Sequence, residues 1–67
     1  MSVARVTEIS ATSKKGFEDA VNRGIARATA TLRGVSGAWI KEQKVIVEEG
    51  KITRYQVNMM VSFVLEG

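Results

Sequence analysis

Apolar residues recur along this chain with two different periods, which divide it into a strand, a helix and a long hairpin. Residues 3–10 alternate and are rich in β-branched side chains, which predicts a short strand. Between Lys14 and Arg33 the apolar residues recur every three or four positions, as on one face of a helix. That predicted face consists of Phe17, Ala20, Val21, Ile25, Ala28 and Leu32.

The ends of the predicted helix carry residues that suit helix termini. Thr12 and Ser13 offer side-chain oxygens that can accept hydrogen bonds from the free amides of the first turn. Gly34 suits the position after the last turn, because glycine adopts the left-handed conformation at little cost. Inside the helix, a stripe of small residues should allow close approach of the sheet or of another subunit; it consists of Ala20, Gly24 and Ala28.

The period changes to two after residue 37 and stays so almost to the end of the chain. This pattern predicts two long strands, residues 38–48 and 52–65, with one tight turn between them. Glu49-Gly50 can supply the positive backbone dihedral angles that a two-residue hairpin turn requires.

A gapless pairing of this hairpin sorts its side chains onto two faces. An apolar row should face the helix and form the core; it consists of Tyr55, Val57, Met59, Val61, Phe63 and Leu65. On the other face Trp39 stands opposite Met60, and Gln43 stands opposite Gln56. These four residues are therefore expected to line one uncovered surface.

The hairpin is longer than the helix that covers it. A strand of residues 52–65 spans about 46 Å, whereas a helix from Lys14 to Arg33 spans about 30 Å. The apolar tip of the hairpin would be exposed in a monomer; it contains Val45, Ile46, Val47 and Ile52. Because exposed strand edges favour pairing with other chains, we expect a closed symmetric assembly of copies.

The composition also points to an assembly of copies. A chain of 67 residues is one small domain, residues 1–67, and such domains are marginal unless disulfides, metals or partners stabilise them. The absence of cysteine and histidine excludes disulfides, thiolate zinc sites and the commonest transition-metal ligand. Calcium or another cation with oxygen ligands remains open, with Glu18-Asp19 and Glu48-Glu49 as carboxylates that could meet across a subunit boundary.

Charge and hydropathy argue against nucleic-acid and membrane partners. The net charge is +3, and the basic residues of the helix are spread out rather than clustered. No apolar run reaches the length of a transmembrane helix, and the N-terminus lacks the apolar core of a signal peptide. We therefore expect a soluble cytoplasmic protein that binds neither nucleic acid nor membrane.

The candidate chemistry is ligand binding rather than catalysis. Without histidine, cysteine or a phosphate-binding glycine motif, the chain shows no catalytic constellation, and we expect no enzyme. Trp39 offers a face on which a flat aromatic ligand can stack. Gln56 and Gln43 offer amide donors and acceptors, and Met60 offers an adaptable wall. Alternatively, Trp39 anchors a subunit interface, which the residue pattern alone favours slightly.

Several short motifs occur together in the order and spacing of one known family. They are Thr12-Ser13 before the helix, the small residues inside it, and the ending Tyr55-Gln56-Val57 followed by Val-Ser-Phe-Val-Leu-Glu at 61–66. In these features the chain resembles the dodecins, small bacterial and archaeal flavin-binding proteins, over nearly its whole length. The family usually has Gly-Thr-Ser where this chain has Ala11 before Thr12.

The resemblance implies an α+β fold of the order β-α-β-β, with a three-stranded antiparallel sheet wrapped around one helix. It also implies a hollow homododecamer that binds, stores or sequesters a flavin (riboflavin, FMN or FAD) without turnover. In the family, paired flavins stack between tryptophans near two-fold axes, and a glutamine on the last strand hydrogen-bonds the ring. Gln56 matches the position of that glutamine.

One departure from the family concerns the tryptophan. Counted back from Gln56 without gaps, the family's stacking position falls on Gly37, whereas Trp39 lies two residues later. A two-residue shift keeps the same face but moves the ring about 7 Å along the strand. The predicted ligand site therefore comprises Trp39, Gln56, Gln43, Gly37 and Met60. The alternative is an altered site that binds calcium, another cation or another small ligand.

Overall fold

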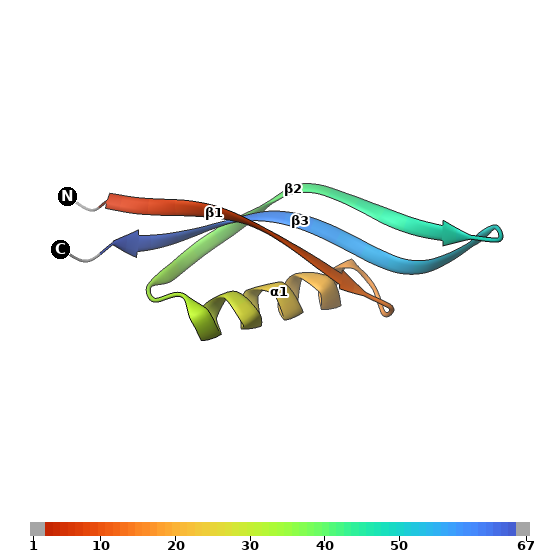
Figure 1. Cartoon of the computed structure of the whole chain (residues 1–67), viewed down its shortest axis with the longest axis horizontal. Coiled ribbons are helices and arrows are strands. Elements are labelled where there is room, and N and C mark those ends of the chain that lie inside the picture. Colours follow the sequence, from red (N-terminus) through yellow and green to blue (C-terminus); the bar gives the residue numbers. More distant parts are fainter. Residues whose placement is uncertain (1–2, 66–67) are drawn as a thin grey trace.

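The computed structural model describes residues 3–65, which form one sheet and one helix (Figure 1). The elements are β1 (Val3–Ser13), α1 (Phe17–Thr31), β2 (Val35–Glu48) and β3 (Lys51–Leu65). Met1, Ser2, Glu66 and Gly67, which include both ends of the predicted domain 1–67, lie outside the described residues. The predicted order of strand, helix and hairpin is confirmed.

β3 is the central strand of a three-stranded antiparallel sheet with the order β1-β3-β2. β1 pairs with β3 along its whole length, from Val3 opposite Leu65 to Ser13 opposite Tyr55. α1 lies against one face of this sheet and contacts β1 and β3 more than β2 (Figure 1). The predicted α+β fold, with a three-stranded antiparallel sheet wrapped around one helix, is therefore confirmed.

The core lies between α1 and the middle of β3. Val57, Met59 and Val61 alternate along β3 and have no exposed surface, as their period of two predicts. Ala20 of α1 is equally buried and packs against this row. A Cβ atom at Gly24 would displace the terminal methyl group of Met59 and would lie 3.2 Å from Ala11 Cβ, so glycine allows this close approach. The predicted stripe of small residues therefore brings the helix close to the sheet.

The two ends of the core differ from each other. At the start of α1, Phe17 packs edge-to-face against Tyr55, with the ring centroids 5.1 Å apart. At the far end, Leu65 is 46% exposed, so the prediction that it packs under the helix is wrong. The reason is length, because β3 continues past the end of α1 toward the C-terminus (Figure 1).

α1 is shorter than its apolar pattern predicts at both ends: β1 continues further than expected, and the helix ends at Thr31, with Leu32 already extended. Thr12 and Ser13 belong to β1, where Ser13 pairs with Tyr55. The helix follows Gly16, and no side chain caps its first amides. Ser13 Oγ instead accepts a hydrogen bond from the amide of Lys15 at 2.9 Å. The prediction that Thr12 and Ser13 cap the helix is therefore wrong.

Both connections that follow α1 and β2 use left-handed residues. Gly34, with φ of 72°, lies one residue later than the predicted position directly after the helix cap, because the C-cap is Leu32. The hairpin turn has φ of 52° at Glu49 and 77° at Gly50. Positive φ at both central residues gives a two-residue turn whose twist matches that of the flanking strands. The turn therefore lies where the sequence predicts it.

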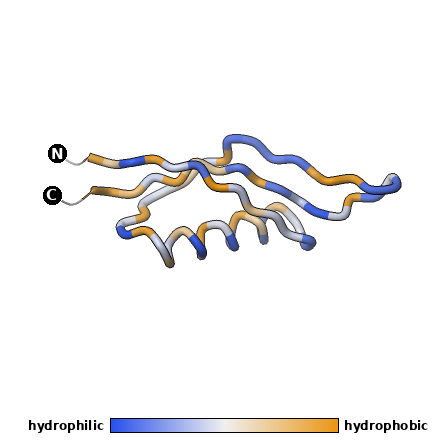
Figure 2. The backbone as a smooth tube through the Cα atoms, in the orientation of Figure 1, coloured by the Kyte–Doolittle hydropathy of each residue, from blue (hydrophilic) through white to orange (hydrophobic). Residues whose placement is uncertain are grey.

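The hairpin formed by β2 and β3 extends well beyond the helix (Figure 1). The fifteen residues of α1 span about 22 Å, whereas the described chain is 51 Å long. Val47 and Ile52 near the tip are 56% and 52% exposed, and apolar segments are visible there in Figure 2. The predicted exposed tip is confirmed for these two residues, while Val45 and Ile46 are half-buried.

The pairing of β2 with β3 departs from the gapless register at β-bulges. Thr53 is an extra residue on β3 near the tip, Lys41 is an extra residue on β2 further along, and Ser36 is a third extra residue at the start of β2. Residues 37–40 pair as predicted, with Trp39 opposite Met60, but residues 42–46, between the extra residues Lys41 and Thr53, are shifted by one residue. Because neighbouring residues in a strand point to opposite faces, this shift changes which side chains share a face.

Candidate ligand-binding site

The face of the sheet that α1 leaves uncovered, here called the open face, is largely polar. On β3 it carries half-buried residues that alternate with the buried row; they are Gln56, Asn58, Met60 and Ser62. Ser10 of β1 stands opposite Asn58, and Thr12 stands opposite Gln56. β1 and β3 therefore contribute side chains to one exposed surface, and the predicted ligand residues can be placed against it.

Trp39 lies at the edge of the open face, on the edge strand β2. It stands opposite Met60 and is 53% exposed, a large apolar surface for one side chain. It also borders a groove of about 530 Å³ between α1 and β2, which Val21, Ile25 and Ile40 help to line. Trp39 is therefore accessible both to a ligand on the open face and to a partner chain along the edge of the sheet.

Gln56 is held on the open face by two neighbours. Its Nε2 donates hydrogen bonds to Ser10 Oγ at 3.1 Å and to Asn58 Oδ1 at 3.2 Å. Asn58 Nδ2 in turn donates to Glu42 Oε1 at 2.7 Å. The amide nitrogen of Gln56 is thus engaged within the chain, whereas its Oε1 accepts no hydrogen bond from any side chain in residues 3–65. This oxygen remains as an acceptor for a ligand.

Gln43 does not lie beside Gln56. The bulge at Lys41 places Gln43 opposite Val57, which faces α1, and places Lys44 opposite Gln56. The prediction that Gln43 and Gln56 line one surface is therefore wrong, because the extra residue in β2 exchanges the two faces. Lys44 is the residue of β2 that neighbours Gln56, which the gapless register could not show.

The bulge also brings a charged pair to the sheet. Lys41 Nζ lies 3.2 Å from Glu8 Oε1, so the lysine side chain reaches across β3 to β1. The two side chains are 53% and 45% exposed, and an ion pair of this kind adds little to stability. Glu8 stands opposite Met60, so the pair borders the open face. Sequence reasoning missed it, since no apolar pattern marks a bulge.

Gly37 leaves space beside Trp39. It stands opposite Ser62, whose Oγ donates a hydrogen bond to the Gly37 carbonyl oxygen at 3.1 Å. A Cβ atom at Gly37 would meet only Ser62 Oγ, at an ordinary contact distance of 3.5 Å. The position that the family resemblance assigns to the stacking tryptophan is therefore open and accessible in this chain.

The described residues outside the open face include one perturbed carboxylate. Hydrogen bonds from Ser13 and then from Arg23 lower the pKa of Asp19, at the start of α1, below its usual value. In the described part of the chain, no group of three or more His, Cys, Asp or Glu residues is placed to hold a metal ion. α1, the helix within residues 3–65, is neither long nor apolar enough to cross a membrane.

Comparison with known proteins gives one consistent family. The family model for dodecin matches residues 3–66. The dodecin of Thermus thermophilus is 36% identical over 64 residues, which cover 96% of this chain and 93% of that protein. The structure of dodecin from Streptomyces davaonensis superimposes with a TM-score of 0.92 at 35% identity, covering 98% of this chain and 97% of that chain. Dodecin from Streptomyces coelicolor gives a TM-score of 0.92 at 32% identity, covering 98% and 94%. The chain therefore belongs to the dodecin family.

Proposed function

We propose that this protein binds a flavin on the open face without turning it over, as a storage or sequestering protein. The observation that carries this proposal is the combination of a half-exposed tryptophan with a glutamine acceptor left unused on the same face of the sheet. Trp39 and Met60 supply apolar surface for the ring, and Gln56 supplies a polar contact for its edge.

The polar edge of a flavin matches the groups around Gln56. That edge carries one N–H donor between two carbonyl acceptors. Gln56 Oε1 can accept from the N–H group. Thr12 and Lys44, which stand opposite Gln56 on the two neighbouring strands, carry donors for the carbonyl oxygens. The flavin site in this proposal therefore uses Lys44, rather than Gln43, as the residue contributed by β2 next to Gln56.

The site becomes complete in an assembly of copies, and family membership supports a homododecamer. A ring that stacks on Trp39 would have its second face in water in a single chain, since Trp39 lies on the edge strand. The exposed Ile40, Val47 and Ile52 likewise need a partner to bury them. A second copy that packs along the edge of β2 would cover these residues and enclose the ring.

Binding without catalysis follows from the chemical groups that the chain supplies. The chain has no histidine or cysteine, and the open face carries amides, hydroxyl groups, a thioether, the Lys41–Glu8 pair, Glu42 and Lys44. An indole that stacks on a bound flavin favours quenching of its excited state. The protein would then protect the cell from flavin photochemistry while it stores the flavin.

The proposal is tested by titrating riboflavin and FMN with the assembled protein while flavin fluorescence is recorded. We expect fluorescence to fall to a constant level at a fixed ratio of flavin to protein chains. Fluorescence that stays unchanged at micromolar protein excess would contradict flavin binding. Repeating the titration in calcium and in chelator shows whether an oxygen-ligated cation takes part.

Two glutamine variants locate the ligand on one face of the sheet. Gln56→Ala removes the unused acceptor of the open face, and we expect flavin affinity to fall about tenfold. Gln43→Ala is the matched control, because the register places Gln43 with Val57 on the opposite face. Equal losses in the two variants would contradict a flavin site on the open face.

A further inference from the structure

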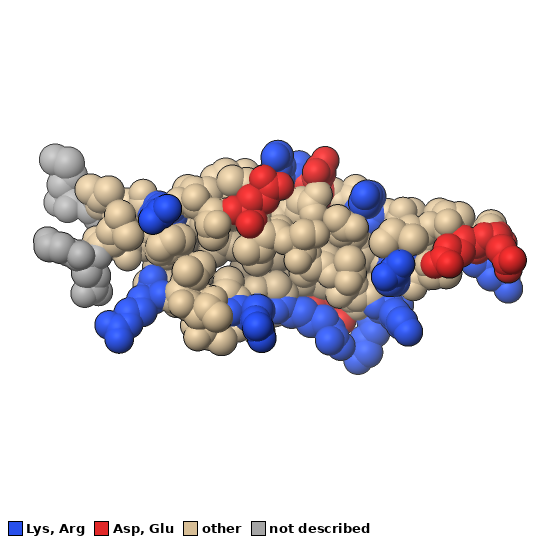
Figure 3. Space-filling model, in the orientation of Figure 1, with Lys and Arg blue, Asp and Glu red and all other residues tan. Residues whose placement is uncertain are grey.

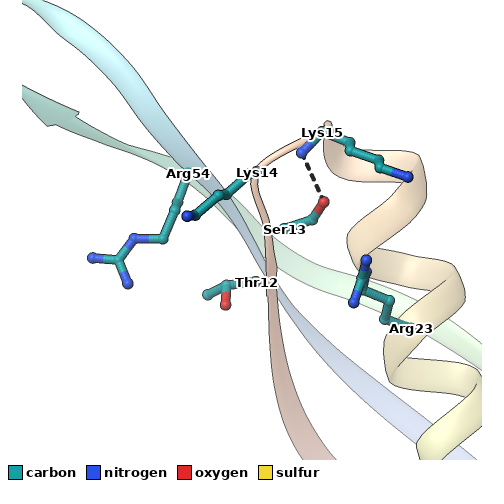
Figure 4. A pocket seen from close by; sticks show the side chains of 6 residues that line it. All are labelled: Thr12, Ser13, Lys14, Lys15, Arg23 and Arg54. Atoms are coloured by element: carbon teal, nitrogen blue, oxygen red, sulfur yellow. Dashed lines mark hydrogen bonds between the residues drawn. The ribbon is translucent and has the colours of Figure 1, made fainter.

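A pocket of about 410 Å³ lies where β1 ends, near the start of α1 and near Arg54 of β3 (Figure 4). It is lined by Thr12, Ser13, Lys14, Lys15, Arg23 and Arg54. Four of these six side chains are cationic, and none is acidic. They come from three separate segments of the chain, so the fold and not a run of sequence gathers them.

Most of the positive charge excess of the described residues lies at this pocket. Residues 3–65 contain ten basic and six acidic residues. Four of the basic residues line the pocket, and within residues 3–65 Asp19 is the one carboxylate that bonds to its lining residues. The other described residues include six basic and five acidic side chains, which nearly balance. Basic side chains are also seen along the side of the molecule that holds α1 (Figure 3).

One of the four cations is already paired, and three are not. Arg23 Nε lies 2.6 Å from Asp19 Oδ2, and Ser13 Oγ donates to the same oxygen at 2.6 Å. Lys14, Lys15 and Arg54 form no ion pair with any residue in the range 3–65. Cations held together without a counter-charge repel one another, and an anion bound between them would relieve that repulsion.

The directions of the side chains suit a phosphate group. In Figure 4, Lys14 and Arg54 point to the same side of the end of β1, with the Thr12 side chain near them. An arginine fork can bind two phosphate oxygens at once, and a lysine and a hydroxyl group can bind the others. Ser13 is buried and already bonds to Asp19 and to the amide of Lys15, so it fixes the end of β1 rather than binding the anion.

We propose that this pocket is an anion site for a phosphate group, bound chiefly by Arg54 and Lys14, with Thr12 as a further donor; the Lys15 side chain extends to the other side, over α1 (Figure 4). The site goes beyond flavin-ring binding, because Lys14 and Arg54 take no part in the proposed contacts with the ring. It adjoins that face, since Thr12 stands opposite Gln56 and Arg54 precedes Gln56 by two residues in β3. The phosphate can therefore belong to a free anion or to a phosphorylated ligand whose ring lies on the open face.

Pyrophosphate in chloride buffer is the first probe, with binding measured by titration calorimetry on the assembled protein. We expect saturable binding that weakens at least fivefold in Arg54→Gln and in Lys14→Gln. Arg27→Gln on the helix and Lys51→Gln at the hairpin remove the same charge outside the pocket, and we expect changes below twofold. Absence of saturable binding, or equal weakening in pocket and control variants, would overturn the proposal.

The second arm identifies the source of the phosphate and rests on the proposed flavin function. If a flavin phosphate occupies the pocket, FMN binds more tightly than riboflavin, and Arg54→Gln abolishes the difference. If FMN and riboflavin bind equally while pyrophosphate still binds, the site takes a separate anion. If neither flavin binds but pyrophosphate does, the flavin proposal fails and the anion site stands. If Arg54→Gln leaves both pyrophosphate binding and an FMN preference unchanged, the anion proposal fails.

Discussion

The two faces of β3 have different roles in one strand. On the face toward α1, Val57, Met59 and Val61 are completely buried by residues of the same chain. On the open face, Gln56 and Met60 are half-buried and stand beside a tryptophan that is 53% exposed. The covered face is complete within a single chain, whereas the open face leaves an acceptor and an aromatic side chain for something else to contact.

The difference shows how a short chain can combine a stable core with a binding surface. A strand alternates its side chains between faces, so one sequence can encode both roles if its register is fixed. Here the core residues and the close approach of Gly24 fix the covered face. The hydrogen bonds from Gln56 to Ser10 and Asn58 then order the open face without covering it.

The largest expected effect contrasts the two neighbouring methionines of β3. Met59→Ala leaves a cavity in the core, and we expect it to lower the free energy of unfolding by about 2–5 kcal/mol. Met60→Ala, the matched variant on the open face, should cost less than 1 kcal/mol by the same physical argument while weakening flavin binding. Chemical denaturation at a fixed protein concentration measures both values. Equal destabilisation by the two variants would contradict the division of roles.

A second prediction concerns the hairpin tip, which one chain leaves bare. Val47→Lys places a charge at a position that is 56% exposed in the single chain, where the cost to a monomer would be small. In an assembly that buries the tip, the same charge should break the complex into smaller species. Size-exclusion chromatography with light scattering measures this change, and Val47→Thr, which keeps the shape, serves as the control. An unchanged large species for Val47→Lys would show that the tip lies outside the interfaces.

A third prediction tests the role of the indole. Trp39→Ala should weaken flavin binding by about 0.5–1.5 kcal/mol from loss of stacking alone. The residual fluorescence of the bound flavin should rise, because the quenching ring is absent. Trp39→Phe should restore part of the affinity but less of the quenching. If Trp39→Ala breaks the assembly and leaves the affinity of the remaining complex unchanged, Trp39 is an interface residue instead.

The smallest expected effect is a pH-dependent loss of stability when Asp19, at the junction of β1 with α1, is replaced. Hydrogen bonds from Ser13 and Arg23 lower the pKa of Asp19 relative to the unfolded chain. The stabilisation of the folded state by ionised Asp19 is therefore present above the unfolded pKa and is lost as pH falls through the lower, folded pKa. We expect Asp19→Asn to be less stable than the wild type at neutral pH, with the difference shrinking in acid below pH 3.8. Melting temperatures across this range check the sign, and a difference that grows in acid would contradict it.

Much of the fold follows from the sequence because burial imposes periodicity. The change from a period of three or four to a period of two gives the helix and the hairpin. Glu49-Gly50 gives the turn, and the buried row of β3 follows from alternation. The end of the core at Leu65 could not be predicted, because it depends on where α1 stops beneath the sheet.

The candidate site was harder to predict because it depends on single-residue register. Trp39 and Gln56 lie on the predicted face, but the extra residue Lys41 moves Gln43 to the other one. Neither Lys41 nor Thr53 is a glycine, the residue that marks one class of bulge, so the sequence does not reveal these two positions. The cationic pocket was missed for a different reason, since Arg54 and Lys14 meet only through the pairing of β1 with β3.

The most direct test of the central claim uses the methyl groups of Met59 and Met60 as reporters of the two faces. Methionine-methyl NMR spectra of the assembled protein are recorded during titration with riboflavin, and Met59→Leu and Met60→Leu assign the two signals apart from that of Met1. The ring current of a flavin on the open face should shift the Met60 signal and leave the buried Met59 signal nearly unchanged. A shift confined to Met59, or no shift of either signal at saturating riboflavin, would contradict a flavin site on the open face.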